Sequence, residues 1–171
     1  MQDLRPITCC FTGYRAEKMP FPAEDTAALS LLTQRLDEAI ADAVAQGILR
    51  FFTGMSTGFD LWAAQAVLRA REKHSLKLLC AIPFDAQADH FSADWKATFN
   101  HVLLHADQVL ILSRGYHTGC YAERNRFMVD ASSRLICYFD GRPGGTAQTV
   151  RMAQASNLTV INLAENQLTL L

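Results

Sequence analysis

The stretch FFTGMSTGFDLWAAQAV, residues 51–67, begins as an apolar run and continues with the apolar spacing of a helix. Its junction holds two glycines and three hydroxyl side chains, at Thr53, Ser56 and Thr57. Such a turn aims the unpaired N–H groups at the start of a helix into the space above a sheet, where an anion can bind. The glycines alternatively only let the chain reverse without a Cβ in the way. Both interpretations predict a strand, a tight turn and a helix.

Six short apolar runs alternate with segments of helical spacing along the chain. The runs cover residues 7–11, 48–52, 76–82, 108–112, 135–139 and 158–163, and helical spacing is clearest in 26–47, 61–74, 121–133 and 144–156. Because polar residues seldom interrupt the runs, we expect strands that are covered on both faces. Strands alternating with helices predict a Rossmann-like α/β fold, with a mainly parallel sheet of about six strands and helices on both faces.

Length and composition limit the possible classes of protein. A chain of 171 residues, half of them apolar, can bury one good core, so residues 1–171 are expected to form a single domain. A net charge of −1 gives no global positive field, so neither nucleic acid nor a membrane surface is expected as a partner. No stretch approaches the ~20 apolar residues of a membrane span, and the N-terminus does not resemble a signal peptide. We expect a cytoplasmic protein.

The five cysteines are odd in number, and Cys9, Cys80 and Cys137 lie inside predicted strands. Buried free thiols in a reducing compartment explain this pattern best. No Cys-x-x-Cys pair occurs in the sequence, so we expect no metal site.

Ligands of a doubly wound sheet bind beyond the carboxyl ends of its strands, so the residues that follow the apolar runs are the candidates for a site. Gly13 and Arg15 follow the first run, and the loop 53–60 follows the second. This loop is neither a Walker P-loop nor a dinucleotide-binding fingerprint, but its glycine-bounded turn and hydroxyls suit a phosphate or ribose. Asp60 alternatively caps the helix and occupies some of those N–H groups.

The segment 114–130, after the fourth run, is the most polar part of the sequence. A charged segment is usually a solvated helix face, and Glu123 with Arg126, or Arg126 with Asp130, would form ordinary intrahelical pairs. Asn125 beside Arg124 fits that interpretation less well, because Asn is a poor helix former whose amide commonly serves a loop or ligand. We therefore favour a functional role for Arg124 and Asn125.

The candidate ligand-binding residues all follow predicted strands at one edge of the sheet. They are Gly13, Arg15, Gly54, Ser56, Thr57, Gly58, Asp60, Arg124, Asn125, Gly144, Gly145 and Thr146. The last three open another helix, whose N-terminus would also attract an anion. No cofactor is expected to be required.

Three segments resemble motifs of the DprA/LOG-like (SLOG) superfamily. GMSTGFD resembles the Ser-Gly-x-Ala-x-Gly-x-Asp loop of DprA, YAERNRFMVD resembles both the Arg-Asn-Arg segment of DprA and the Glu-Arg-Lys segment of the LOG enzymes, and RPGGT resembles Pro-Gly-Gly-x-Gly-Thr of LOG. The order of these motifs over nearly the whole chain looks most like the small bacterial YpsA-type branch. The resemblance implies a Rossmann-like fold with a nucleotide pocket over the sheet edge, and its LOG-type members suggest a homodimer.

The resemblance also bears on chemistry, because LOG enzymes hydrolyse the N-glycosidic bond of nucleoside monophosphates. They use an arginine that corresponds to Arg124 and a glutamate after the Gly-Thr, where this chain has Ala147-Gln148-Thr149 and no carboxylate. Without a carboxylate to stabilise the oxocarbenium-like transition state, we expect a binder or sensor of a nucleotide-derived ligand such as ADP-ribose, NAD or a mononucleotide.

Two alternatives remain open. The first is an N-glycoside hydrolase of nucleoside monophosphates, in which Arg124 positions the phosphosugar and Glu123 is the acid/base. The second is a single-stranded DNA-binding or interaction protein similar to DprA. DNA binding needs a basic groove with stacking aromatics, whereas acidic residues interleave with the arginines of the segments 114–130 and 134–142.

Overall fold

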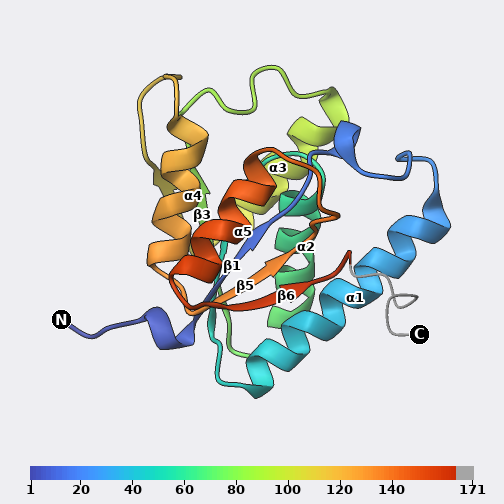
Figure 1. Ribbon diagram of the computed structural model, residues 1–171. Coiled ribbons are helices and arrows are strands. Elements are labelled where there is room, and N and C mark those ends of the chain that lie inside the picture. Colours follow the sequence, from blue (N-terminus) through green and yellow to red (C-terminus); the bar gives the residue numbers. More distant parts are fainter. Residues whose placement is uncertain (165–171) are drawn as a thin grey trace.

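The computed structural model describes residues 1–164, which form a six-stranded parallel sheet flanked by helices (Figure 1). The strands are β1 (Thr8–Thr12), β2 (Arg50–Thr53), β3 (Lys77–Ile82), β4 (Gln108–Ile111), β5 (Arg134–Cys137) and β6 (Thr159–Asn162). Every one overlaps a predicted apolar run, and all five pairings between neighbours are parallel. The predicted Rossmann-like α/β fold is therefore confirmed.

The helices are α1 (Thr26–Ala45), α2 (Phe59–Arg71), α3 (Ala93–His105), α4 (Cys120–Asp130) and α5 (Gly145–Ala155). Four of them coincide with the segments of clear helical spacing, whereas α3 was not identified from the sequence. Features that favour a helix are nevertheless present there. The hydroxyl of Ser92, the N-cap, accepts a hydrogen bond from the Trp95 N–H at 3.3 Å, and Phe99 and Val102 are buried on one face of the helix. A short 3₁₀ turn, Ala16–Lys18, follows β1.

The helices cover the sheet from both sides (Figure 1). Alternate strand residues face opposite layers, so Phe51 packs in the cluster formed with α1, α2 and α3, while Phe52 packs with α4 and α5. The central strands β1, β2 and β3 are almost wholly buried, as expected. The prediction of coverage on both faces is wrong for the edge strand β4, where Val109 is 40% and Ile111 is 55% exposed. The helices lie over the centre of the sheet and leave this edge open.

All five cysteines are free and buried, as the sequence predicts. Loss of hydration raises the pKa of the Cys10, Cys80 and Cys137 thiols to about 12, so they remain protonated. Among residues 1–164, the structure contains no helix with the length and apolar character that crossing a bilayer requires.

The strand order β4-β3-β2-β1-β5-β6 contains one reversal. From β1 the chain builds outward through β2 and β3 to β4, and it then returns to place β5 on the other side of β1. The connection after β1 and the connection after β5 therefore run toward opposite edges of the sheet. Such a reversal opens a crevice at the carboxyl ends of the strands, which is the usual ligand position in this class of fold.

Candidate functional site

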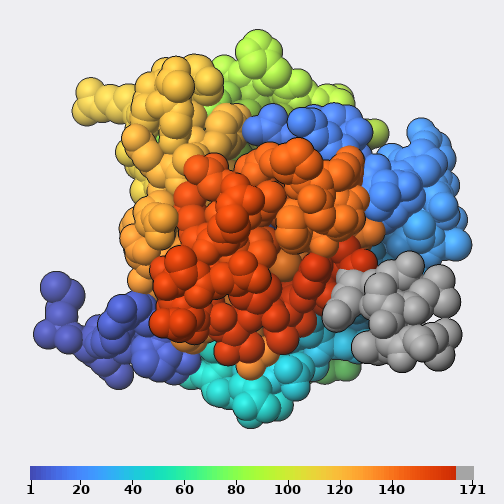
Figure 2. Space-filling view, viewed as in Figure 1, coloured from blue at the N-terminus to red at the C-terminus, as the bar shows by residue number. Residues whose placement is uncertain are grey.

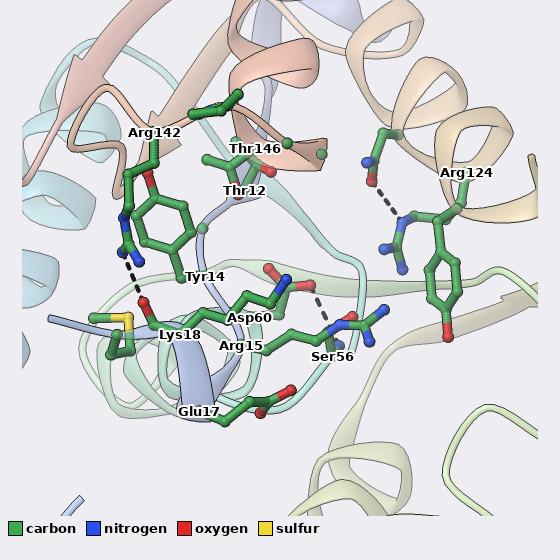
Figure 3. Close-up of a pocket in the computed structure, with 17 residues that line it drawn as sticks. Thr12, Tyr14, Arg15, Glu17, Lys18, Ser56, Asp60, Arg124, Arg142 and Thr146 are labelled. Carbon is green, nitrogen blue, oxygen red and sulfur yellow. Dashed lines mark hydrogen bonds between the residues drawn. The ribbon is translucent and has the colours of Figure 1, made fainter. Parts of the chain in front are cut away.

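A pocket of about 650 Å³ lies at this reversal, within the size range of small-molecule sites. We call it the switch-point pocket (Figure 3). Its walls come from the segment 12–19 after β1, Ser56 and Asp60 after β2, the segment 142–146 after β5, and Tyr121, Arg124 and Asn125 of α4. In Figure 2 the blue segment after β1 and the orange segment after β5 lie side by side at the upper part of the molecule.

Most of the residues predicted from the sequence line this pocket. They are Gly13, Arg15, Ser56, Asp60, Arg124, Asn125, Gly144, Gly145 and Thr146. Thr57 instead lines a neighbouring pocket, and Gly54 and Gly58 line neither. The topology brings segments that are far apart in the sequence to one place, because the strand ends that carry them are adjacent.

The glycines of the loop after β2 allow close internal contacts. Gly58 has φ = 79°, and a Cβ there would lie 2.5 Å from the backbone nitrogen of Ala16 and 2.7 Å from the carbonyl oxygen of Tyr14. A Cβ on Gly54 would lie 2.5 Å from Nη1 of Arg124 and 2.9 Å from Oδ2 of Asp60. Gly58 therefore requires glycine for packing and for its backbone conformation, whereas a Cβ on Gly54 would displace the Arg124 and Asp60 side chains.

The N–H groups of the same loop are also largely used within the protein. Ser56 N–H donates to Oδ2 of Asp60 at 3.3 Å, and Phe59 N–H donates to the Tyr14 carbonyl at 3.1 Å. The hydroxyl of Thr53 donates to the Asp60 carbonyl at 2.9 Å. Asp60 does not cap α2, because the N-cap is Gly58 and no side chain caps it, but its carboxylate occupies the Ser56 N–H of the loop. The capping alternative is therefore wrong, and the contacts of Ser56 and Phe59 leave the loop with fewer donors for a phosphate.

Arg124 projects from α4 into the floor of the pocket and is only 4% exposed. Its Nη1 donates to the carbonyl oxygens of Gly54 and, at 3.4 Å, Ala81, while its Nε donates to Oδ1 of Asn125 at 2.7 Å. Burial lowers the pKa of this guanidinium, and the charge of Asp60 opposes that effect. Arg124 therefore ties α4 to the ends of β2 and β3.

Asp60 is the buried carboxyl group of the pocket floor, with 6% exposure. Burial raises its pKa to about 6, although the charge of Arg124 and the Ser56 N–H favour the ionised form. The two buried charges thus compensate each other in part, and the carboxyl group titrates near neutral pH.

The N-terminus of α5 presents free backbone donors to the pocket. The first helical hydrogen bond joins Gln148 N–H to the Gly144 carbonyl at 3.0 Å, so the N–H groups of Gly145, Thr146 and Ala147 precede the hydrogen-bonded ladder. A Cβ on Gly144 or Gly145 would meet no atom within 4 Å. An anion can therefore approach this helix end closely, and the helix dipole favours it.

One wall is held by a cluster that the sequence did not reveal. Tyr14 donates its hydroxyl to Oδ1 of Asp140 at 2.6 Å, and Arg142 Nε donates to the same carboxylate at 3.0 Å. Arg142 also donates from Nη2 to the Lys18 carbonyl at 2.7 Å, and its guanidinium lies 4.3 Å from the centre of the Tyr14 ring. The bond from Arg142 holds the pKa of Asp140 at about 2. The cluster joins the segments that follow β1 and β5.

Positively charged side chains outnumber negatively charged ones in the lining of the pocket. Arg15, Lys18, Arg124 and Arg142 line it together with only two carboxyl groups, Glu17 and Asp60. Arg124 and Arg142 are fixed by protein groups, whereas Arg15 and Lys18 are exposed and form no ion pair with residues 1–164. These two cations are therefore the ones most available to an anionic ligand.

Glu123 lies outside the pocket. It is exposed on α4, and its Oε2 lies 3.0 Å from Nε2 of His117. The structure therefore does not bring the acid/base of the alternative hydrolase to the site. Glu17, Tyr14 and Lys18 were missed in the sequence, although all follow β1 beside Gly13 and Arg15, within the region where ligand contacts are expected.

Comparison with known proteins agrees with this architecture. The UPF0398 protein BH1768 of Halalkalibacterium halodurans is 22% identical over 147 residues, which cover 84% of this chain and 78% of the relative. The UPF0398 protein YpsA of Bacillus subtilis is 24% identical over 138 residues, covering 79% and 77%.

Among solved structures, DNA processing protein A from Helicobacter pylori, described for its single-stranded DNA binding mode, superposes with a TM-score of 0.63. The match covers 95% of this chain and 67% of that chain at 16% identity, so the likeness concerns the fold alone. A family model described as the YspA SLOG family matches residues 9–165, and the chain therefore belongs to this family.

Proposed function

We propose that the switch-point pocket binds a small phosphate-bearing ligand of the nucleotide type, such as ADP-ribose, NAD or a mononucleotide, and that the protein is a binder or sensor of this ligand. The observation that carries the proposal is the N-terminus of α5, where Gly144, Gly145 and Thr146 line a pocket with excess positive charge and the N–H groups of Gly145 and Thr146 precede the first helical hydrogen bond. Backbone donors and arginine side chains are the usual partners of phosphate oxygens.

The buried part of the pocket supports binding rather than catalysis. Arg124 donates from Nη1 to Gly54 and Ala81 and from Nε to Asn125, so these protein contacts fix its position in the floor of the pocket. Arg15 and Lys18, together with the helix end, would carry the direct contacts to phosphate. No carboxylate follows Gly145-Thr146 in the sequence, where the resembling hydrolases have theirs.

Hydrolysis of an N-glycosidic bond is the second candidate, and one observation favours it. Asp60 lines the pocket with its pKa raised to about 6, a value suited to proton transfer near neutral pH. Its Oδ2 accepts from the Ser56 N–H, however, and its burial is explained by its contact with the loop. We therefore rank this candidate below simple binding.

Single-stranded DNA binding, for which the Helicobacter pylori structure is described, is the third candidate. The pocket mixes Glu17 and Asp60 with its arginines, and the neighbouring Asp140 is fully ionised above pH 4. A continuous DNA track needs an uninterrupted basic groove. A compact ligand with a few phosphate oxygens fits the charge better.

Calorimetric titration with ribose 5-phosphate, AMP, ADP-ribose, NAD and unphosphorylated adenosine tests the proposal. We expect the phosphate-bearing compounds to bind and to raise the melting temperature, because a ligand of the folded state stabilises it. Adenosine should bind much more weakly. Failure of every phosphate-bearing compound to bind, or equal binding of adenosine and AMP, would refute the proposal.

The same incubations distinguish binding from hydrolysis. We expect no free base when AMP is followed by chromatography over hours. Protein-dependent release of adenine that is lost in Asp60→Asn would instead establish the second candidate.

A further inference from the structure

A second hollow adjoins the switch-point pocket along the carboxyl edge of the sheet. Its volume is about 370 Å³, and it shares Arg15, Glu17, Ser56 and Tyr121 with the first pocket. The two pockets are therefore adjacent, and together they extend from the segment after β5 to the segment after β3. The shared residues form the boundary between the two parts.

The second hollow is lined by aromatic side chains, and we call it the aromatic pocket. Phe84 follows β3, Phe91 precedes α3, Trp95 lies in its first turn, and Tyr121 comes from α4. These rings rest on other rings: Trp95 lies 5.8 Å from Trp62 between ring centres, and Tyr121 lies 5.9 Å from Phe84. They are held by packing and still border an open space, as a stacking site for a planar group requires.

The aromatic pocket also contains one unpaired polar atom. Gln87 is only 5% exposed, and its Nε2 donates to the Gly54 carbonyl at 3.0 Å and to the Ser56 hydroxyl at 3.4 Å. Its Oε1 is the single buried side-chain polar atom without a hydrogen-bond partner among the described residues. A buried acceptor without a donor is costly, so Gln87, which lines the aromatic pocket, gains a hydrogen bond when its side chain turns toward a donor in that pocket.

We infer that the aromatic pocket is the subsite for a nucleobase with an amino or ring N–H donor, and that the same ligand places its phosphate at the N-terminus of α5. This inference rests on the proposed function and specifies its ligand as an extended nucleotide that spans both pockets. Arg15, whose guanidinium lies 4.8 Å from the centre of the Tyr121 ring, stands at the boundary and contacts the link between base and phosphate.

Tryptophan fluorescence tests the subsite, because the chain contains only Trp62 and Trp95. Trp62→Phe leaves Trp95 as the single fluorophore, and Trp95→Phe leaves Trp62 as a matched control. ADP-ribose should quench the emission of the first variant and leave that of the second nearly unchanged, whereas ribose 5-phosphate should quench neither.

Affinity measurements complete the test. Trp95→Ala and Gln87→Leu should each weaken the binding of ADP-ribose, the former by about 5- to 150-fold, the range expected for loss of one base–aromatic stack. Both should leave the affinity for ribose 5-phosphate unchanged, which shows that they are folded and that the phosphate site is intact.

The outcomes separate the two proposals. If ribose 5-phosphate binds but ADP-ribose binds no more tightly, and Trp95→Ala affects both equally, the nucleobase subsite is refuted while the phosphate site stands. If neither compound binds, the proposed function itself fails. If a single-stranded oligonucleotide binds through Trp95 far more tightly than ADP-ribose does, the hollow serves nucleic acid and the inference is overturned.

Discussion

Arg124 on α4 donates a hydrogen bond from Nη1 to the carbonyl oxygen of Gly54, 70 residues earlier in the chain. The same guanidinium donates from Nε to Asn125, and it lies so close to Gly54 that a Cβ there would displace it. The loop after β2 and the helix α4 are therefore fixed to each other beneath the switch-point pocket. The floor of the pocket is therefore held in one arrangement by contacts within the protein.

Replacement of Arg124 by lysine tests this relationship. Lysine keeps the charge but cannot donate simultaneously to Gly54, Ala81 and Asn125, because it lacks the planar fork of guanidinium donors. We expect Arg124→Lys to reduce the free energy of unfolding by about 1–3 kcal/mol through lost buried hydrogen bonds. Urea denaturation measures this change.

Arg126 supplies the matched control on the same helix. It is exposed, and its Nη1 lies 3.8 Å from the carboxylate of Asp130 in an ordinary i,i+4 pair. Arg126→Lys should alter the free energy of unfolding by less than about 0.5 kcal/mol. Equal effects of the two substitutions would show that Arg124 belongs to a solvated charged face after all.

Asp60 predicts an unusual dependence of stability on pH. Its pKa is raised from 3.8 to about 6 in the folded protein, mainly by burial. At a pH between these two pKa values, the Asp60 carboxyl group is protonated in the folded state and ionised in the unfolded state. Asp60 therefore makes the free energy of unfolding fall as the pH rises. The contribution is on the order of 2–3 kcal/mol between about pH 4 and pH 6.5. Asp60→Asn should remove this fall.

Asp140 serves as the control for that experiment. Its pKa is lowered to about 2, chiefly by Arg142, so its stabilising contribution is complete above pH 4 and is lost only as the pH falls toward 2. Asp140→Asn should therefore shift the stability curve between pH 4 and pH 6.5 without changing its slope. A constant difference between Asp60→Asn and the wild type across this window would contradict the prediction for Asp60.

The sequence was sufficient to predict the sheet and the edge at which the switch-point pocket lies. In the run 76–82 only Lys77, at the exposed start of β3, is polar, because the rest of the strand is covered on both faces, and the topology places the carboxyl ends of the strands at one edge. The helix α3 was missed because its residues are mostly exposed and only Phe99 and Val102 are fully buried, so its periodicity is weak.

The role of the glycine loop could not be predicted from its residues. Whether the Phe59 N–H faces a ligand or the Tyr14 carbonyl depends on how closely the segment after β1 approaches, and only the folded arrangement determines that distance. The cluster of Tyr14, Asp140 and Arg142 likewise joins residues more than a hundred positions apart. Local patterns carry no information about such contacts.

Two alanine substitutions separate Gly58, which packs within the protein, from Gly145, for which we propose a place beside the ligand. Gly58→Ala places a Cβ against the Ala16 and Tyr14 backbone at a φ of 79°, so it should destabilise the fold by about 1–3 kcal/mol or more. Gly145→Ala meets no atom within 4 Å and should leave the melting temperature nearly unchanged. Its methyl group would nevertheless stand in the path of a phosphate at α5, so calorimetric titration should show weaker binding of ribose 5-phosphate. Unchanged binding by Gly145→Ala would remove α5 from the site.

The final prediction concerns Arg15, the exposed arginine that lines both pockets. Arg15→Gln removes a charged donor to phosphate while keeping a side chain of similar length. A hydrogen bond to a charged group contributes about 1.5–3 kcal/mol, so the dissociation constants of ribose 5-phosphate and ADP-ribose should rise about 10- to 100-fold.

Arg114 is also exposed but lines neither pocket, which makes Arg114→Gln the control for a general loss of positive charge. Calorimetry at two salt concentrations distinguishes a direct contact of Arg15 with the ligand from a general effect of charge. A general effect would weaken ligand binding by both variants equally, and the difference from the wild type would disappear at high salt. A loss confined to Arg15→Gln places the ligand at the boundary of the two pockets, and equal losses would remove it from there.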